Sequence, residues 1–175
     1  MRKASALAGA FLFILSCTVS QQPQPSKAPS GTPAMQVAIV ELAKGGSFTF
    51  RLRPDKAPAT VSNFVQKAKD HKYDGLRFHR VEDWVVQGGD PLGNGQGGGK
   101  MPSEYNDLPF GVGAVGIARG GDPKINNDMQ WFVTKTEASW LNKQYTNFGQ
   151  VQSGMEVVQK IAIGDVIKSI RIEDR

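Results

Sequence analysis

The chain has 175 residues, 39% of them hydrophobic, which allows one ordinary domain with terminal extensions. Its 20 glycines and 10 prolines argue against a helical bundle, and its single cysteine excludes an internal disulfide. The formal net charge of +5 comes from scattered Lys and Arg, which favours a mixed solvated surface and no nucleic-acid partner.

The N-terminal segment has the features of a signal peptide. Arg2 and Lys3 precede an apolar run over residues 4–15, shorter than the about 20 residues that span a bilayer. The run ends in Ile-Leu-Ser-Cys, which resembles the bacterial lipobox and implies cleavage before Cys17 and lipidation of that cysteine. We therefore expect a signal peptide over residues 1–16, export across the inner membrane, and a lipid anchor in the cell envelope. An ordinary secretory signal with a chance cysteine is the alternative.

Residues 18–34 are rich in Gln, Pro, Ser and Lys and have almost nothing to bury. Such a segment cannot offset its ordering entropy, so Cys17 and the residues up to 34 are predicted to form a disordered, lipidated tether. The pattern changes at Met35, and residues 35–175 are predicted to form the folded domain.

Short strands dominate the predicted domain. Residues 37–42 and 47–52 read as a hairpin around Gly45-Gly46, and Pro58 opens a helix with apolar residues at helical spacing. Further strands are expected at residues 76–81, 85–88, 112–118, 130–134, 149–152 and 167–172, and a second helix at residues 155–161. This content predicts a mainly β fold, a closed eight-stranded antiparallel β-barrel capped by two α-helices.

Two patterns suggest chemistry that the surrounding sequence does not support. Residues 93–98 match G-x-G-x-x-G, but no helical pattern follows to face a pyrophosphate, so a nucleotide site is not expected. The two histidines, His71 and His79, have no Cys or carboxylate at metal-ligand spacing, so neither a metal nor a cofactor is expected.

Five segments combine cationic, amide and apolar side chains. They are Phe78-His79-Arg80, Trp84-Val85-Val86-Gln87, Ala118-Arg119-Gly120, Gln130-Trp131-Phe132, and Trp140-Leu141 with Tyr145. Alternation places Phe78 with Arg80, Val85 with Gln87, and Gln130 with Phe132. Each apolar residue alone reads as core, but a face with Arg and two Gln is too polar for a core.

The run from Phe78 through Gln87-Gly88-Gly89-Asp90, and the order of the later segments, resembles the cyclophilins, which are peptidyl-prolyl cis/trans isomerases. The resemblance covers residues 35–175. It implies catalytic roles for Arg80, Gln87 and Gln130, and proline-containing polypeptides as partners. The remaining residues that it assigns to substrate binding are Phe78, His79, Trp84, Val85, Ala118, Arg119, Gly120, Phe132, Trp140, Leu141 and Tyr145.

The chemistry of the Xaa-Pro bond explains the arginine. Twisting the amide removes its resonance, and the nitrogen regains a lone pair that can accept a hydrogen bond. A guanidinium is a permanent cation with rigid donors, so Arg80 beside that nitrogen would stabilise the twisted state more than the planar one.

The sequence departs from the family pattern at several positions. The link from Arg80 to Trp84 is one residue shorter than usual, with Glu82-Asp83 in place of a Pro-Gly turn. Tyr145 replaces a common histidine, while the retained Trp140 favours some binding of cyclosporin-like ligands.

Three functions are compatible with these patterns. The favoured one is a monomeric, lipid-anchored isomerase of extracytoplasmic proteins, which assists their folding. A cyclophilin-fold module that binds proline segments without catalysis is the second, and Arg80 argues against it because binding alone needs no cation at the ring nitrogen. A surface lipoprotein unrelated to these enzymes is the third.

Overall fold

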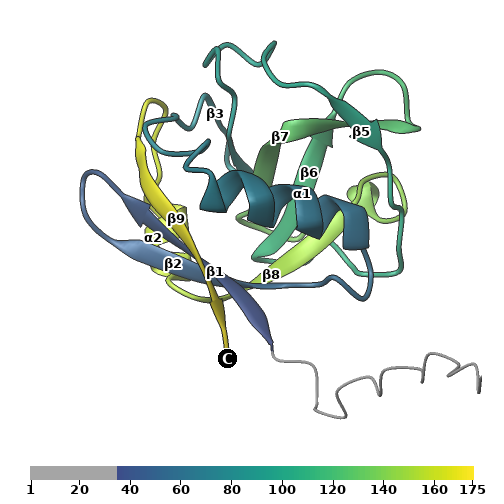
Figure 1. Ribbon diagram of the computed structural model, residues 1–175, viewed down its shortest axis with the longest axis horizontal. Helices are drawn as coiled ribbons and strands as arrows, with labels where there is room; N and C mark the ends of the chain where they lie inside the picture. Colours follow the sequence, from purple (N-terminus) through teal and green to yellow (C-terminus); the bar gives the residue numbers. More distant parts are fainter. Residues whose placement is uncertain (1–34) are drawn as a thin grey trace, which may run out of the picture. The chain divides into compact units, whose positions relative to one another are not determined.

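The computed structural model describes residues 35–175, which fold around one nine-stranded antiparallel sheet (Figure 1). The strands are β1 Gln36–Leu42, β2 Ser47–Leu52, β3 Arg80–Val81, β4 Val85–Gly88, β5 Lys100–Pro102, β6 Ala114–Arg119, β7 Ile125–Thr134, β8 Asn147–Ser153 and β9 Ile167–Asp174. Eight of them follow one another in the order β3-β4-β7-β6-β8-β2-β1-β9, and β5 pairs with β7 beside that path. The predicted signal peptide, 1–16, and tether, 17–34, lie outside the described residues.

The two ends of the eight-strand path meet through a short bridge. Arg77, just before β3, pairs with Val166, just before β9. The amide of Phe78 donates a hydrogen bond to the carbonyl of Asp165 over 2.9 Å. The mainly β, eight-stranded antiparallel fold with two helices is thus confirmed, as a curled sheet whose closure depends on this bridge and not on a continuous ladder.

Pairing of β1 with β9 brings the two ends of the domain together. Gln36 lies opposite Asp174 in this antiparallel pair. Beyond them, the amide of Met35 donates to the carbonyl of Arg175 over 2.7 Å, and the amide of Arg175 returns a bond of 2.8 Å to Met35. The first and last described residues are therefore hydrogen-bonded neighbours.

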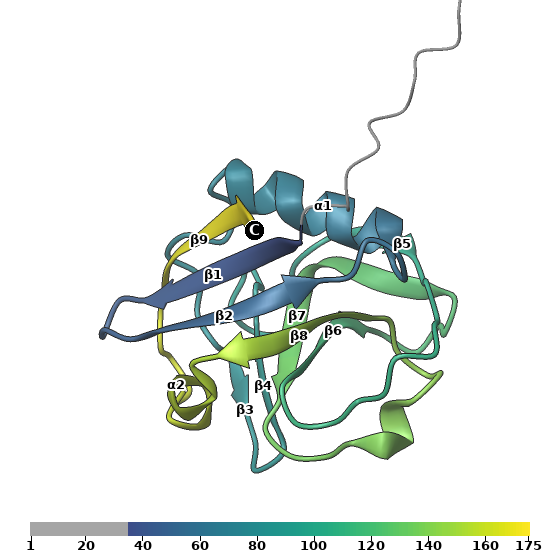
Figure 2. The ribbon, with the colours of Figure 1, turned by 90° about the horizontal axis from the view of Figure 1, so that it is seen from below.

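Two helices and one short 3-10 helix accompany the sheet: α1 Pro58–Lys69, η1 Ser139–Leu141 and α2 Met155–Gln159. Pro58 suits the first turn of α1, because its missing N–H would have no partner there. The buried side of α1 carries Val61 and Phe64 and packs against β7 and β9. Figure 2 shows α1 and α2 on opposite sides of the curled sheet. No helix within residues 35–175 has the length and apolar character needed to cross a membrane.

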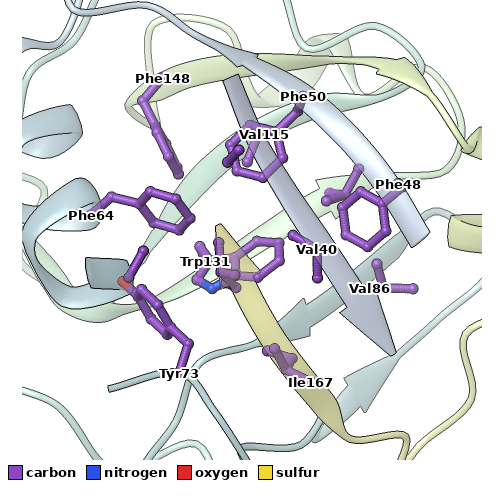
Figure 3. Packing of buried hydrophobic residues seen from close by; sticks show 14 of the residues in the cluster. Val40, Phe48, Phe50, Phe64, Tyr73, Val86, Val115, Trp131, Phe148 and Ile167 are labelled. Carbon is purple, nitrogen blue, oxygen red and sulfur yellow. The ribbon is translucent and has the colours of Figure 1, made fainter. Parts of the chain in front are cut away.

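The core inside the curl is built around Trp131 (Figure 3). The indole is fully buried, and the ring centroids of Phe50, Phe64 and Phe78 lie 6.0, 5.9 and 5.9 Å from its own. Tilted and edge-on contacts at such distances are favourable for aromatic pairs. Truncating such a fully buried aromatic side chain costs about 3–5 kcal/mol, so this cluster contributes a large share of the stability.

Apart from shifts of one or two residues at element ends, the observed elements differ from the predicted ones at β3, β5, β7 and η1. The strand expected over residues 76–81 is regular only at β3, because the residues before it bridge to the segment that precedes β9. The strand expected to begin at residue 130 begins at Ile125, since its first residues pair with β5, which the sequence pattern did not predict. The 3-10 helix η1 was not predicted either.

Candidate active site

A second apolar cluster lies on the face of the sheet opposite the core, and strand alternation creates it. On β4, Val86 points into the core while Val85 belongs to the second cluster. On β7, Trp131 points into the core while Phe132 joins Val85. Leu141 of η1 packs onto the same cluster. The regular period of two in β4 and β7 thus gives the sheet an apolar patch on its outer face.

A glycine in β6 makes room for the ring of Phe132 in this patch. A Cβ placed on Gly116 would lie 2.3 Å from Cζ of Phe132 and 2.8 Å from Cε1 of Phe110. The two rings stack with their centroids 5.7 Å apart. Gly116 therefore allows the ring of Phe132 to approach the backbone of β6 closely, and glycine inside a strand often marks such a close approach.

This patch is the floor of a cavity of about 500 Å³. Its lining combines the apolar floor with cationic, amide and aromatic groups from β3, β4, β6, β7 and the η1 segment. The lining residues are Arg80, Trp84, Val85, Gln87, Ala118, Arg119, Phe132, Trp140, Leu141, Gln144 and Tyr145.

The guanidinium of Arg80 is held at the cavity from two sides. Its Nε donates to Oε1 of Glu82 over 2.8 Å, and its Nη1 donates to Oε1 of Gln87 over 3.2 Å. Its Cζ lies 5.3 Å from the ring centre of Trp84, within range of a cation–π contact. A guanidinium has five N–H donors. In the part of the chain that the structure describes, the other three N–H groups of Arg80 have no hydrogen-bond partner.

Two glutamines connect Arg80 to the glycine-rich loop over residues 93–98. Nε2 of Gln87 donates to Oε1 of Gln130 over 2.9 Å. Nε2 of Gln130, which is 3% exposed, donates to the carbonyls of Gly95 and Gly97 over 3.1 and 2.8 Å. Each amide thus accepts on one side and donates on the other, which fixes the orientation of both side chains.

The loop itself is anchored by the buried carboxylate of Asp90. This carboxylate accepts hydrogen bonds from the backbone amides of Leu92, Asn94 and Gly95. Burial alone would raise the pKa of Asp90, but the three amide donors outweigh it, and the pKa lies below its ordinary value. Asp90 is therefore a charged anchor for the loop at neutral pH.

Aromatic side chains form the rim of the cavity on two sides. Trp84 and Trp140 meet edge to face with their centroids 5.5 Å apart, and Trp140 remains 60% exposed. On the other side, Cζ of Arg119 lies 4.6 Å from the ring centre of Tyr145, and its Nε donates to the carbonyl of Gln144 over 3.0 Å. An open rim with exposed aromatic surface suits an extended apolar or peptide ligand.

Comparison with known proteins identifies the family. Residues 37–174 match the family model described as cyclophilin type peptidyl-prolyl cis-trans isomerase/CLD. The chain is a cyclophilin. It is 38% identical over 144 residues to peptidyl-prolyl cis-trans isomerase B of Bacillus subtilis, and the match covers 79% of this chain and 99% of that protein. It is 39% identical over 145 residues to a peptidyl-prolyl cis-trans isomerase of Synechococcus elongatus, covering 79% and 97%.

The solved structures agree with this assignment. The crystal structure of a cyclophilin type peptidyl-prolyl cis-trans isomerase of Cryptosporidium parvum superposes with a TM-score of 0.73 at 26% identity, covering 81% of this chain and 99% of that one. This cyclophilin is thus a peptidyl-prolyl cis-trans isomerase. Residues 35–175 lie within one compact unit, and the Bacillus subtilis relative consists almost wholly of the matched region.

Most residues that the sequence assigned to the cyclophilin site line the cavity, but four do not. Phe78 points into the core beside Trp131 instead of sharing a face with Arg80, so its predicted contact with substrate is wrong in this structure. Gln130 and Gly120 line a neighbouring cavity of about 500 Å³. His79 lies half-buried near Gly95, and burial lowers its pKa.

Three residues important to the cyclophilin site had not been predicted. Gln144 carries no motif signal, whereas Gly116 could have been found as a glycine inside an apolar strand. The role of Glu82 depends on a turn that the sequence pattern does not specify. No group of three or more His, Cys, Asp or Glu within residues 35–175 is arranged to hold a metal ion.

Proposed function

We propose that this cyclophilin isomerises Xaa-Pro bonds of extracytoplasmic polypeptides without a covalent intermediate. In this mechanism the proline ring rests on the floor around Phe132, and Arg80 donates a hydrogen bond to the imide nitrogen as the bond twists. Gln87 and the backbone of Arg119 hold the carbonyls of the bound peptide. The mechanism needs neither a nucleophile nor a titrating acid, since a fixed cation is sufficient to favour the twisted state.

The observation that carries the proposal is a guanidinium with unused donors at the edge of an apolar floor. Arg80 lines the same cavity as Phe132, Leu141 and Val85. Three of its N–H groups have no hydrogen-bond partner among residues 35–175. An apolar floor suits a proline ring, and the free donors suit the lone pair that appears on its nitrogen.

Typical free energies show how much of the rate acceleration Arg80 can supply and how much must come from binding the peptide. A charge-assisted hydrogen bond contributes about 1.5–3 kcal/mol. Because about 1.36 kcal/mol corresponds to a tenfold change in rate, Arg80 alone supplies roughly 10- to 150-fold. A larger acceleration has to come from holding the peptide in the cavity while the ring lies against Phe132.

The mechanism is tested by Arg80→Ala and Arg80→Lys in residues 35–175, with an Xaa-Pro peptide as substrate. The uncatalysed isomerisation takes about 10–100 s at 25 °C, so modest catalysis is measurable. We expect kcat/KM to fall by roughly 10- to 150-fold in Arg80→Ala. Arg80→Lys should lie between, because an ammonium lacks the planar fork. Arg51→Ala, an exposed arginine of β2, is the control. Equal activity of Arg80→Ala and the control would refute the mechanism.

We also propose that the protein is exported and anchored to the cell envelope by a lipid on Cys17. This proposal rests on the apolar run over residues 4–15 and on the position of Cys17 after it. With full-length protein expressed in a bacterial host, radiolabelled palmitate should be incorporated, and the protein should sediment with membranes. Cys17→Ser should abolish both. If the Cys17→Ser variant still incorporated the label and still sedimented with membranes, the proposed anchor would be contradicted. The catalytic mechanism would not be affected.

A further inference from the structure

Glu82 occupies the short turn between β3 and β4, and its backbone is pinned there. Its amide donates to the carbonyl of Val85 over 2.9 Å, which closes the turn. Its carbonyl accepts a hydrogen bond of 3.1 Å from Nζ of Lys135, and the amide of Lys135 donates to the carbonyl of Trp84 over 2.7 Å. These hydrogen bonds fix the backbone of Glu82, and so the position from which its side chain extends.

The carboxylate of Glu82 holds two cavity residues at once. Oε1 accepts from Nε of Arg80 over 2.8 Å, and Oε2 accepts from Nε1 of Trp84 over 2.8 Å. Both partners line the cavity, whereas Glu82 does not. Each carboxylate oxygen thus holds a different cavity residue, although Glu82 itself does not line the cavity.

We propose that Glu82 is a positioning residue, which fixes the guanidinium of Arg80 relative to the indole of Trp84 before substrate binds. This inference rests on the proposed role of Arg80. Engaging Nε leaves the terminal N–H groups for substrate, apart from the one that bonds Gln87. The side chain of Arg80 is 43% exposed, so an unheld guanidinium would sample many rotamers. Donors that are oriented beforehand need no reorganisation when the bond twists.

The test compares Glu82→Gln and Glu82→Ala with Asp83→Asn, in residues 35–175. Asp83 is the matched control, because it lies in the same turn and its side chain forms no hydrogen bond within the described part of the chain. Glu82→Gln removes the charge but can still accept from Trp84, so we expect kcat to fall about two- to fivefold with KM unchanged. Glu82→Ala removes the hydrogen bonds to both Arg80 and Trp84, so kcat/KM should fall about tenfold, with a rise in KM. Asp83→Asn should match the parent.

The positions of the two partners are measured directly by NMR. The Nε1–H resonance of Trp84 should shift in Glu82→Ala and stay near its parental position in Glu82→Gln. The Nε–H proton of Arg80 should exchange with water faster in both variants. Unfolding midpoints equal to that of Asp83→Asn would show that each variant is folded.

The outcomes separate this inference from the mechanism on which it rests. Parental activity in Glu82→Ala, beside the expected loss of activity in Arg80→Ala, would overturn the role of Glu82 alone. A fall in activity of Glu82→Ala with unchanged Trp84 and Arg80 signals would also overturn it, because the loss would not act through position. An increase in kcat would overturn it as well, by showing that Glu82 competes with substrate for Arg80. An Arg80→Ala variant as active as the Arg51→Ala control would instead refute the mechanism itself.

Discussion

Replacing Gly116 by Ala should disturb catalysis without replacing any side chain that contacts the substrate. The added Cβ would lie 2.3 Å from Cζ and 2.7 Å from Cε1 of Phe132. An ordinary contact needs at least about 3.4 Å, so the ring has to move by about 1 Å or the backbone of β6 has to shift. Phe110, at 2.8 Å from the same Cβ, blocks an easy escape.

The magnitude follows from two effects of this displacement. Overpacking a well-packed cluster costs about 1–3 kcal/mol of unfolding free energy. A misplacement of about 1 Å at a substrate-positioning group can cost about 100-fold in rate. We therefore expect Gly116→Ala to lose about 1–3 kcal/mol of stability and up to about 100-fold in kcat/KM.

Urea unfolding and the Xaa-Pro assay measure the two effects. Gly111→Ala is the matched control, since a Cβ on Gly111 meets no atom within 4 Å. In a Phe132→Leu background the smaller side chain relieves the clash, so the stability cost of Gly116→Ala should shrink. Parental stability and activity in Gly116→Ala, or an equal cost in both backgrounds, would refute the reasoning.

The glycine loop and its glutamine relay give two further predictions. Asp90→Asn should lower the unfolding free energy by about 1–3 kcal/mol at neutral pH, because three backbone amides lose a charged acceptor. The folded state depresses the pKa of Asp90, so this stability is present above the unfolded pKa and is lost as pH falls through the folded value. The difference from the parent should therefore shrink in acid, and a constant difference would contradict the assignment. Gln130→Ala should lower kcat/KM by about tenfold, since Gln87 loses its buried acceptor; unchanged kinetics would exclude the relay.

Strand alternation predicted the faces of β4 and β7 correctly, because both strands are regular where they meet the site. Val85 and Gln87 line the cavity while Val86 lies in the core, and Phe132 and Trp131 separate in the same way. In such strands a period of two is enough to assign inside and outside.

Alternation failed at Phe78 and Arg80 for a physical reason. Phe78 and His79 lie outside the regular strands and bond to different neighbours, the first to Asp165 and the second to the carbonyl of Gln87. The period of two is interrupted where the chain passes from one neighbour to the other. Phe78 consequently turns inward, while Arg80 faces the cavity.

The rest of the site depends on contacts between residues far apart in the sequence. The resemblance implied a catalytic role for Gln130, which in the structure reaches Arg80 only through Gln87. Its own partners are the carbonyls of Gly95 and Gly97, more than 30 residues earlier, and their positions depend on the path of the whole loop. No local pattern encodes that path, so only the folded chain reveals the relay.

The mutual hydrogen bonds between Met35 and Arg175 place the two ends of the described chain side by side. A linker of a few residues could join these ends, and the chain could be reopened at the Gly45-Gly46 turn between β1 and β2 to give a circular permutant with the same sheet. A reporter fused after residue 175 would, for the same reason, emerge beside whatever precedes residue 35. A binding partner or support attached at either end would therefore hold the domain at one and the same point.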